Sequence, residues 1–356
     1  MTLADAVRRG LHLGDDAAVS LHEQEDFSNI NYVYRVEVPG RTIYLKVIPE
    51  RPRRLPIRLP RERVFSEAEG IRRFRGLAGD GVLIPEVLFV DEQEMAFAMS
   101  DVGEGRQVLF SVLAQRFDLL TEHGAALGKA LGTVHSGTRG SQSPRSPEEE
   151  QIIRKVIFDG LLAPGAKAVF PEQWDEVNAE MQAHTECLVH GDLWSKNLLV
   201  RDGAPIAVVD FEGISFGDPA FDLGTLIAVA LLPALENPAL REQALKFCAQ
   251  LLESWTSACS AEPSSSEFLG VPRSSSADRP MSEEPRNSEE PRNSSQWAAE
   301  VLPRTFRATA TFLASRGFGP FAYAMSDEAR ERVGTLARSL ATNPPATFEE
   351  FTGRLS

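Results

Sequence analysis

The stretch His190-Gly191-Asp192-Leu193-Trp194-Ser195-Lys196-Asn197 indicates the fold of this 356-residue chain more strongly than any other segment. Two short apolar runs come after it, separated by the turn residues Arg201-Asp202-Gly203, and the second run ends at Asp210. Short apolar runs around an Asp-Gly turn predict a β-hairpin. Such a hairpin would close between Asn197 and Asp210, so it would bring the side chains of Asp192, Asn197 and Asp210 into one small volume.

These three side chains suit the transfer of a phosphoryl group from a nucleoside triphosphate. The reaction needs a carboxylate that orients the attacking hydroxyl and metal ions across the phosphates. Asp192 would be that carboxylate. Mg²⁺ takes few protein oxygens, usually from carboxylates or amides, so Asn197 and Asp210 are its expected ligands. An isolated His-Gly-Asp is more often a surface loop, but the ordered series of loop, strand, turn, strand and acid favours the functional interpretation.

The stretch resembles the catalytic loop of the protein-kinase-like small-molecule phosphotransferases, which include aminoglycoside phosphotransferases, choline kinases and methylthioribose kinases. These enzymes have the pattern H-G-D-x-x-x-x-N where protein kinases have His-Arg-Asp. The resemblance continues through Asp210-Phe211-Glu212 to Phe221-Asp222-Leu223-Gly224. It implies ATP and Mg²⁺ as cofactors, Glu212 as a residue near the substrate, and Asp222 as a structural acid that begins a helix and holds the catalytic loop.

The N-terminal third contains candidates for the other half of an ATP site. Residues 31–48 alternate as two strands around a Pro-Gly turn. Lys46 lies in the second strand, where kinases place the lysine that holds the ATP phosphates, although a lone lysine on an edge strand more often faces solvent. Glu67 opens a helical run and resembles the ion-pair partner of that lysine. Glu69 is the alternative partner, on another face of the helix.

Two loops are expected to contact the rest of the nucleotide. The segment 27–31 takes the position of a phosphate loop without its usual glycines, and its Asn29 and Asn31 resemble the Asn-x-Asn segment of methylthioribose kinases. An apolar strand over 95–99 then leads into a polar link. We expect Ser100 and Val102 in this link to meet adenine through backbone groups.

These elements predict an α+β fold with two lobes. A small, mostly antiparallel N-lobe would span residues 1–102 and a larger helical C-lobe residues 103–356, with ATP between them. A long core helix is expected over 117–135. The segment 258–295 is rich in Ser, Pro, Glu and Arg and repeats a six-residue unit. Such a composition buries too little apolar surface to offset its ordering entropy, so we expect a disordered insertion within the C-lobe.

Composition limits the partners and the compartment. The chain is 42% hydrophobic, and we expect no apolar run of transmembrane length and no signal peptide at its N-terminus, hence a cytoplasmic protein without a membrane partner. Its formal net charge of −14 argues against nucleic acid. Three cysteines without metal spacing are expected to be free thiols. The sequence does not indicate an oligomeric state.

An arginine-rich segment, residues 51–63, departs from this acidic average. Its prolines prevent a continuous helix. The segment is either a solvated linker or an electropositive flap over the nucleotide phosphates, since the arginine fork suits phosphate oxygens.

The substrate is inferred from resemblance. The Asn-x-Asn segment, the D-x-E spacing and the pair Arg304 and Arg307 favour a methylthioribose-type, sugar-like alcohol held by one of these arginines. In that family the arginines are adjacent, and the catalytic loop usually has His-Thr-Gly-Ser where this chain has Trp-Ser-Lys-Asn. An aminoglycoside kinase, a choline or ethanolamine kinase, and a nucleotide-binding pseudokinase scaffold stay open as alternatives. A choline site needs aromatic walls, and four Trp and four Tyr offer few.

Overall fold

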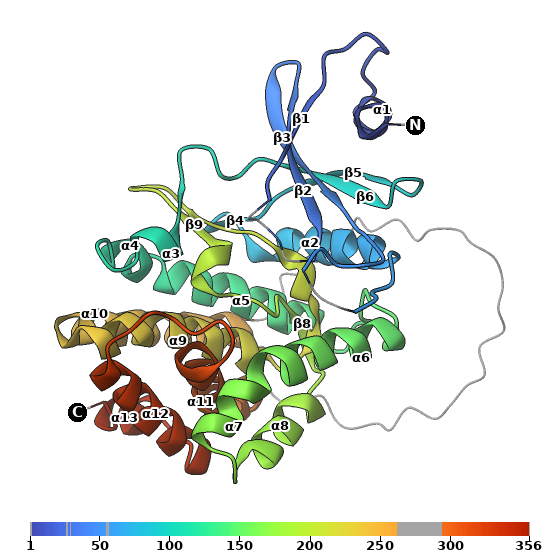
Figure 1. The fold of residues 1–356 in the computed structure, drawn as a ribbon. Helices are drawn as coiled ribbons and strands as arrows, with labels where there is room; N and C mark the ends of the chain where they lie inside the picture. The colour runs from blue at the N-terminus through green and yellow to red at the C-terminus, as the bar shows by residue number, and fades with distance from the viewer. Residues whose placement is uncertain (1, 26–27, 29, 55–56, 262–293, 356) are drawn as a thin grey trace.

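The computed structural model describes residues 2–25, 28, 30–54, 57–261 and 294–355 (Figure 1). An antiparallel sheet occupies the N-terminal part, in the upper half of Figure 1, and helices make up most of the remaining chain. This arrangement confirms the predicted α+β fold. The exact boundary between the lobes, near residue 102, stays a prediction.

The N-terminal sheet has five strands in the order β1-β2-β3-β6-β5, and each neighbouring pair is antiparallel. The strands are β1 (Ser20–Glu23), β2 (Tyr32–Val38), β3 (Arg41–Val47), β5 (Val87–Asp91) and β6 (Ala96–Ser100). The β2–β3 hairpin turns at Gly40, whose φ of 80° is favourable for glycine. The two predicted alternating strands around a Pro-Gly turn are therefore present.

The alternation of side chains along β3 determines which way Lys46 points. Ile43 and Leu45 are buried in one cluster with Val7 of helix α1 (Leu3–Gly10), on one face of the sheet. Phe97, the partner of Lys46 on β6, is buried in the other cluster, which includes residues of α2 (Arg63–Ala78). Since successive strand residues face opposite sides, Lys46 points toward α2.

The predicted catalytic hairpin is present. Strands β9 (Leu198–Val200) and β10 (Ile206–Val208) pair antiparallel, and Gly203 in their turn has a φ of 63°. A sheet with the order β4-β10-β9-β7 includes β4 (Val82–Leu83) and β7 (Gln107–Val108). Strand β8 (Cys187–Val189), just before the catalytic loop, pairs with β11 (Ser215–Gly217).

Helices build the remainder of the protein. They are α3 (Leu109–Val112), α4 (Asp118–Thr121), α5 (Gly124–Thr138), α6 (Pro147–Lys155), a π-helical turn (Val156–Leu162), α7 (Ala163–Val169), α8 (Trp174–Ala183), α9 (Pro219–Glu236), α10 (Arg241–Ser260), α11 (Ser294–Phe318), α12 (Asp327–Thr342) and α13 (Phe348–Gly353). Three short 3₁₀ turns lie at Ser195–Asn197, Phe211–Gly213 and Pro238–Leu240.

The predicted single helix over 117–135 is two helices, α4 and α5, separated at Glu122 and His123. Helix α5 begins at Gly124, and glycine favours a helix end over a helix interior. It packs against α10 through glycines: a Cβ at Gly124 would lie 2.9 Å from the carbonyl oxygen of Phe247, and one at Gly128 would lie 2.2 Å from that of Leu251. The glycines therefore let the two backbones approach closely.

Helix α9 corrects the expectation that no apolar run has transmembrane length. Within the described ranges, it is the one helix long and apolar enough to span a membrane, with a mean hydropathy of 1.5 over its 18-residue window. However, 83% of that window is buried inside the protein. Its apolar length is thus explained by its place in the core, beside α11 and α12.

The predicted disordered segment, 258–295, is helical at both ends, because residues 258–260 belong to α10 and residues 294–295 to α11. Residues 262–293 lie outside the described residues, so their predicted disorder stays a prediction. The helices on either side of them end close together. The hydroxyl oxygens of Ser260, at the end of α10, and Ser295, at the start of α11, lie 3.3 Å apart. Trp255 and Trp297 pack together nearby, with ring centroids 5.6 Å apart. The two helix ends that flank residues 262–293 therefore meet at one place.

Candidate active site

Lys46 lies at the centre of a buried group of charges. Its Nζ is 2.6 Å from Oε1 of Glu67, 2.9 Å from Oδ1 of Asp210 and 3.7 Å from Oε2 of Glu212. Burial alone would lower the pKa of Lys46, but Asp210, Glu67 and Glu212 outweigh it and raise the pKa above its usual value. Lys46 is therefore charged. Glu69 instead pairs with Arg73, at 2.8 Å, so Glu67 is the partner of the lysine.

The catalytic loop places an amide against the carboxylate of Asp192. Nδ2 of Asn197 donates to Oδ2 and to the backbone carbonyl of Asp192, both at 2.9 Å. The amide oxygen of Asn197 is thereby left for another partner. Burial raises the pKa of Asp192 to about 6; the charge of Arg316 opposes this rise and that of Asp210 adds to it. This pKa suits a carboxylate that accepts a proton near neutral pH.

Gly191 gives the loop its shape. Its φ is 77°, and a Cβ there would lie 2.3 Å from the carbonyl oxygen of Gly213. No other residue type fits this close approach without a shift of the backbone. The contact joins the catalytic loop to the turn after Asp210. A side chain at position 191 would therefore displace the loop and, with it, Asp192.

Asp222, in the first turn of α9, holds the backbone of the loop. Its Oδ2 accepts a hydrogen bond from the backbone N–H of His190 at 2.8 Å, and its Oδ1 accepts one from that of Gly191 at 3.0 Å. His135 Nε2 lies 3.3 Å from Oδ2 of Asp222, and Trp255 Nε1 lies 3.0 Å from Nδ1 of His135. Because the indole N–H can only donate, Nδ1 of His135 accepts and Nε2 carries the proton toward Asp222.

The turn after β10 places Asp210 and Glu212. Asp210 has a φ of 61°, in the left-handed region that aspartate tolerates better than most residues. Arg145, which no sequence motif singles out, is 5% exposed and donates to the backbone carbonyls of Ile214 and Glu212. It precedes α6 in a loop without periodicity. Arg145 therefore positions the turn rather than the reacting groups.

Glu212 connects the two halves of the site. Its Oε2 accepts from Nδ2 of Asn31 at 2.9 Å and from the hydroxyl of Ser28 at 3.3 Å. Arg63 donates to Oδ1 of Asn31 at 2.7 Å and so fixes that amide. Burial raises the pKa of Glu212 to about 8; the charge of Asp210 adds to the rise and that of Lys46 opposes it. The structure thus brings Asn31 to the site, while Asn29 lies outside the described residues.

The predicted adenine link comes after β6. Ser100 is the last residue of β6, and its hydroxyl accepts from the backbone N–H of Glu86 at 2.9 Å. The backbone carbonyl of Val102 accepts from Arg106 at 3.2 Å. Contact of Ser100 and Val102 with adenine stays a prediction.

Arg304 and Arg307, the predicted substrate arginines, are held by carboxylates of the helical part. Arg304 pairs with Asp218 at 2.7 Å and Glu186 at 3.0 Å. Arg307 pairs with Glu176 at 2.9 Å and Glu180 at 3.0 Å. These ion pairs engage both guanidinium groups within the protein. The contacts of the residues that the structure describes do not bring either arginine to Asp192, so they offer no support for a substrate role.

A different arginine of α11, Arg316, lies beside the catalytic loop. The carbon Cζ of its guanidinium lies 3.8 Å from the ring centroid of Trp194. Tyr323 approaches the same loop, where its hydroxyl is 2.7 Å from that of Ser195. Lys196 Nζ lies 5.1 Å from the Trp194 ring centroid. The sequence carries only a weak signal for Arg316, since it stands beside a glycine near the end of a long helix, and no spacing links it to Asp192.

Phe110, Trp194 and Tyr323 form an aromatic cluster at the catalytic loop. The ring centroids of Phe110 and Tyr323 are 5.3 Å apart, those of Phe110 and Trp194 are 6.2 Å apart, and those of Trp194 and Tyr323 are 6.4 Å apart. Lys196 Nζ lies 5.2 Å from the Phe110 ring centroid. The aromatic cluster therefore carries two cations, Arg316 and Lys196.

The arginine-rich segment bonds mostly to the N-terminal part. Arg58 pairs with Glu50 at 2.7 Å, and Arg53 pairs with Glu23 at 3.0 Å. Arg61 donates to the backbone carbonyls of Ile48 at 3.0 Å and of Glu94 at 2.9 Å. These contacts favour the linker interpretation for most of the segment, whereas Arg63 at its end bonds to Asn31 of the expected phosphate loop.

The residues predicted to bind Mg²⁺ have a suitable donor set. Within the described ranges, no group of three or more His, Cys, Asp or Glu side chains forms a metal site. The expected ligands are instead one amide oxygen, from Asn197, and one carboxylate, from Asp210. Mg²⁺ usually keeps several waters and takes only one or two protein carboxylates. The hydrogen bonds of Asn197 are made by Nδ2 and leave its oxygen for this purpose, so the residues fit the ion.

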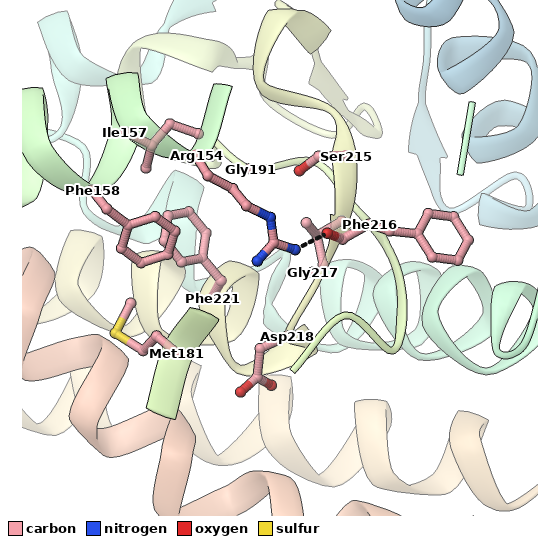
Figure 2. A pocket seen from close by; sticks show the side chains of 11 residues that line it. Arg154, Ile157, Phe158, Met181, Gly191, Ser215, Phe216, Gly217, Asp218 and Phe221 are labelled. Atoms are coloured by element: carbon pink, nitrogen blue, oxygen red, sulfur yellow. Dashed lines mark hydrogen bonds between the residues drawn. The ribbon is translucent and has the colours of Figure 1, made fainter. Parts of the chain in front are cut away.

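A small cavity borders Gly191 (Figure 2). Its volume of about 30 Å³ is room for one or two waters and far too small for a nucleotide. Arg154 points into it and donates to the backbone carbonyl of Phe216 at 2.8 Å. The cavity is lined by both polar and apolar residues: Arg154, Ile157, Phe158, Met181, Val189, Gly191, Ser215, Phe216, Gly217, Asp218 and Phe221. This cavity is a packing feature behind the loop.

Two curated relatives resemble this sequence. It is 28% identical to a methylthioribose kinase of Bacillus velezensis over 246 residues, 59% of this chain and 60% of that protein. It is 25% identical to a 4-hydroxytryptamine kinase of Psilocybe cyanescens over 194 residues, 48% of this chain and 54% of that protein. The chain thus spans less than two thirds of the length of these relatives.

A solved structure and a family model extend the comparison. A thermostable mutant aminoglycoside phosphotransferase in complex with ADP and hygromycin B aligns over 96% of this chain and 98% of its own, with a TM-score of 0.49 and 14% identity. The sequence model of the phosphotransferase enzyme family matches residues 26–257. That match covers more than half of the chain and contains Lys46, Asp192 and Asp210, so the chain belongs to the phosphotransferase enzyme family.

Proposed function

We propose that this protein is an ATP-dependent kinase that phosphorylates a hydroxyl group of a small molecule. The observation that carries the proposal is that two pairs of residues, Lys46 with Asp210 and Asp192 with Asn197, converge. Lys46, paired with Glu67, lies 2.9 Å from Asp210. Asp192, bonded to Asn197, lies near enough to Asp210 for the charge of Asp210 to add to the rise of its pKa. A pseudokinase scaffold would not need a carboxylate kept partly buried and oriented by an amide.

Each of these residues has a role in the transfer. Mg²⁺-ATP, when bound, would supply the phosphoryl group. Lys46 would bind phosphate oxygens, and Asn197 and Asp210 would hold the metal. Asp192 would accept the proton of the acceptor hydroxyl as that oxygen bonds to the γ-phosphorus and ADP leaves. The hydrogen bond from Asn197 Nδ2 fixes the carboxylate of Asp192, which would then be held in one orientation for the acceptor hydroxyl.

We further propose a sugar-like acceptor without positive charge. The methylthioribose kinase relative supports the sugar, and the charges beside Asp192 support the lack of a cation. Arg316 and Lys196 would repel a cationic aminoglycoside. An aromatic cluster can bind a quaternary ammonium group such as choline, but here the two cations of the protein itself lie on those rings and would repel a third positive charge.

A turnover panel tests this proposal. Purified protein with Mg²⁺-ATP would be assayed for acceptor-dependent ADP release against methylthioribose, ribose, kanamycin and choline. We expect turnover with the sugars and little with the cations. Efficient phosphorylation of kanamycin or choline, with none of the sugars, would overturn the substrate assignment while leaving the kinase assignment intact. No acceptor-dependent ADP with any of these alcohols, or with the anionic sugar glucuronate, would oppose the kinase assignment itself.

A further inference from the structure

Arg316 differs from the other buried arginine of α11, Arg304, in its partners. Arg304 forms two ion pairs with carboxylates. Arg316 is 5% exposed, yet it takes part in no ion pair closer than 4.0 Å with a residue that the structure describes. Burial of an unpaired charge is costly, so such a group is usually retained for a purpose.

The guanidinium of Arg316 also lacks hydrogen-bond partners among the described residues. Its Nε is buried without one, and the group packs instead on the face of the Trp194 ring, at 3.8 Å. A ring face satisfies part of the charge but none of the N–H donors. These donors therefore lack the acceptor that buried arginines normally have.

The position of Arg316 relative to the catalytic loop is fixed by its neighbours. Tyr323 donates its backbone N–H to the carbonyl of Arg316 at 2.7 Å. The hydroxyl of Tyr323 in turn lies 2.7 Å from that of Ser195. The segment 316–323 is thus tied to the loop that carries Asp192.

Lys196 adds a second cation on the same aromatic cluster. It is exposed, and its Nζ lies 5.2 Å from the Phe110 ring centroid and 5.1 Å from that of Trp194. Phe110 itself is 40% exposed, so the outer side of the cluster is open. The aromatic cluster at the catalytic loop therefore offers two positive charges, Arg316 and Lys196, beside an apolar surface.

We propose that the acceptor alcohol carries an oxyanion, a carboxylate or a phosphate ester, which binds Arg316 and Lys196 while its apolar part contacts Phe110 and Trp194. The proposal rests on the proposed kinase function and specifies its substrate class. The planar fork of arginine matches the two oxygens of such a group, and the lysine adds a second charge. Both cations belong to the surroundings of the catalytic loop, whereas Lys46 is already engaged by Glu67 and Asp210.

Binding of matched probes tests the proposal without knowledge of the natural substrate. Benzoate, benzamide, benzylamine and inorganic phosphate would be titrated by calorimetry into the full chain with Mg²⁺ and a non-hydrolysable ATP analogue. Benzoate and benzamide share a ring and differ in charge. We expect at least about tenfold tighter binding of benzoate than of benzamide, the size of one charge-assisted hydrogen bond, and weakest binding of benzylamine.

Substitutions then assign the effect to these side chains. Arg316→Met and Lys196→Met should each remove most of the preference for benzoate, while Arg316→Lys should retain part of it. Lys129→Met and Arg241→Met, both exposed and distant in sequence, are the matched controls and should leave it unchanged. If Arg316→Met does not fold, Arg316→Lys and Lys196→Met still decide the outcome.

Three results of the binding experiments would overturn the proposal: equal binding of benzoate and benzamide, a preference that survives both substitutions, or binding of phosphate only when the ATP analogue is absent. The last would assign the cations to the nucleotide. A turnover arm compares glucuronate, glucose and glucosamine, which share a ring and differ in charge. Benzoate binding without any turnover would oppose the kinase function alone, whereas turnover that prefers glucosamine would oppose the oxyanion site alone.

Discussion

Burial and the charge of Arg316 shift the pKa of Asp192 in opposite directions, and a single substitution of Arg316 separates the two effects. Burial raises its pKa to about 6, and the charge of Arg316 lowers it. The carboxylate accepts a proton only when ionised, so activity should fall as pH drops through about 6.

Arg316→Met removes the charge that stabilises the ionised form, so the acidic limb of the kcat profile should move to higher pH. Arg316→Lys should keep the limb near its original position. The measurement is kcat at saturating substrates between about pH 5 and about pH 9. An unchanged limb in Arg316→Met would show that the arginine does not influence the carboxylate.

Gly191 offers a second test at the scale of one residue. Gly191→Ala places a Cβ 2.3 Å from the carbonyl oxygen of Gly213, at a φ of 77°. The loop must shift, and a displacement of about 1 Å can cost about 10²-fold in rate. Gly203→Ala is the matched control, because Gly203 has a φ of 63° with nothing within 4 Å of its Cβ position. Equal effects of the two on kcat would attribute the loss to backbone strain instead of the contact.

At the scale of elements, the close packing of α5 on α10 depends on its glycines. A Cβ at Gly128 would lie 2.2 Å from the carbonyl oxygen of Leu251, so Gly128→Ala should force the helices apart and lower the free energy of unfolding by more than about 2 kcal/mol. Gly76→Ala, in α2 with open space around its Cβ position, should instead stabilise by about 0.5–1 kcal/mol. Denaturant unfolding of both variants measures the contrast.

A stabilising Gly128→Ala would contradict the close approach of the two helices. The consequence extends to the site, because α5 also carries His135. Nε2 of His135 lies 3.3 Å from Oδ2 of Asp222, whose carboxylate accepts hydrogen bonds from the backbone N–H groups of His190 and Gly191. We therefore expect Gly128→Ala to lower kcat together with stability.

At the scale of the whole molecule, the ends of the insertion meet. The hydroxyls of Ser260 and Ser295 are 3.3 Å apart, so removal of residues 262–293 with a short Gly-Ser link should preserve the fold. Loop-closure entropy changes by only about 0.6 kcal/mol per doubling of length, and a shorter loop is slightly favourable. We expect an unchanged kcat and a Tm equal to or slightly above that of the full chain. A marked fall in Tm would mean that the segment packs on the helices.

Sequence patterns located those parts of the site that short motifs carry. Lys46, Asp192, Asn197 and Asp210 each stand at a characteristic place in a strand or a hairpin, and the structure groups Lys46 with Asp210 and Asp192 with Asn197. Pattern alone does not reveal long-range pairing. Arg304 and Arg307 resemble substrate residues along the chain, yet distant acids neutralise them.

Contacts between distant segments leave no local pattern in the sequence, so further features of the structure are not predicted from it. Arg145 and Arg316 reach the site from a loop and a helix end that show no periodicity, so only the folded packing identifies them. The break at Glu122 and His123 was missed because apolar periodicity continues across it, while the glycines that set the approach of α10 give no periodic signal.

The central claim is that Asp192 accepts the proton in an ATP-dependent phosphoryl transfer. The most direct measurement is the rate of acceptor-dependent ADP formation by Asp192→Asn, together with its Kd for Mg²⁺-ATP. Positioned acid-base groups contribute about 10²–10⁴-fold, so transfer should fall by at least about 10²-fold while the Kd stays within about threefold. Asp210→Asn should instead weaken Mg²⁺-ATP binding. An Asp192→Asn enzyme that retains transfer within about tenfold of the parent would contradict the account.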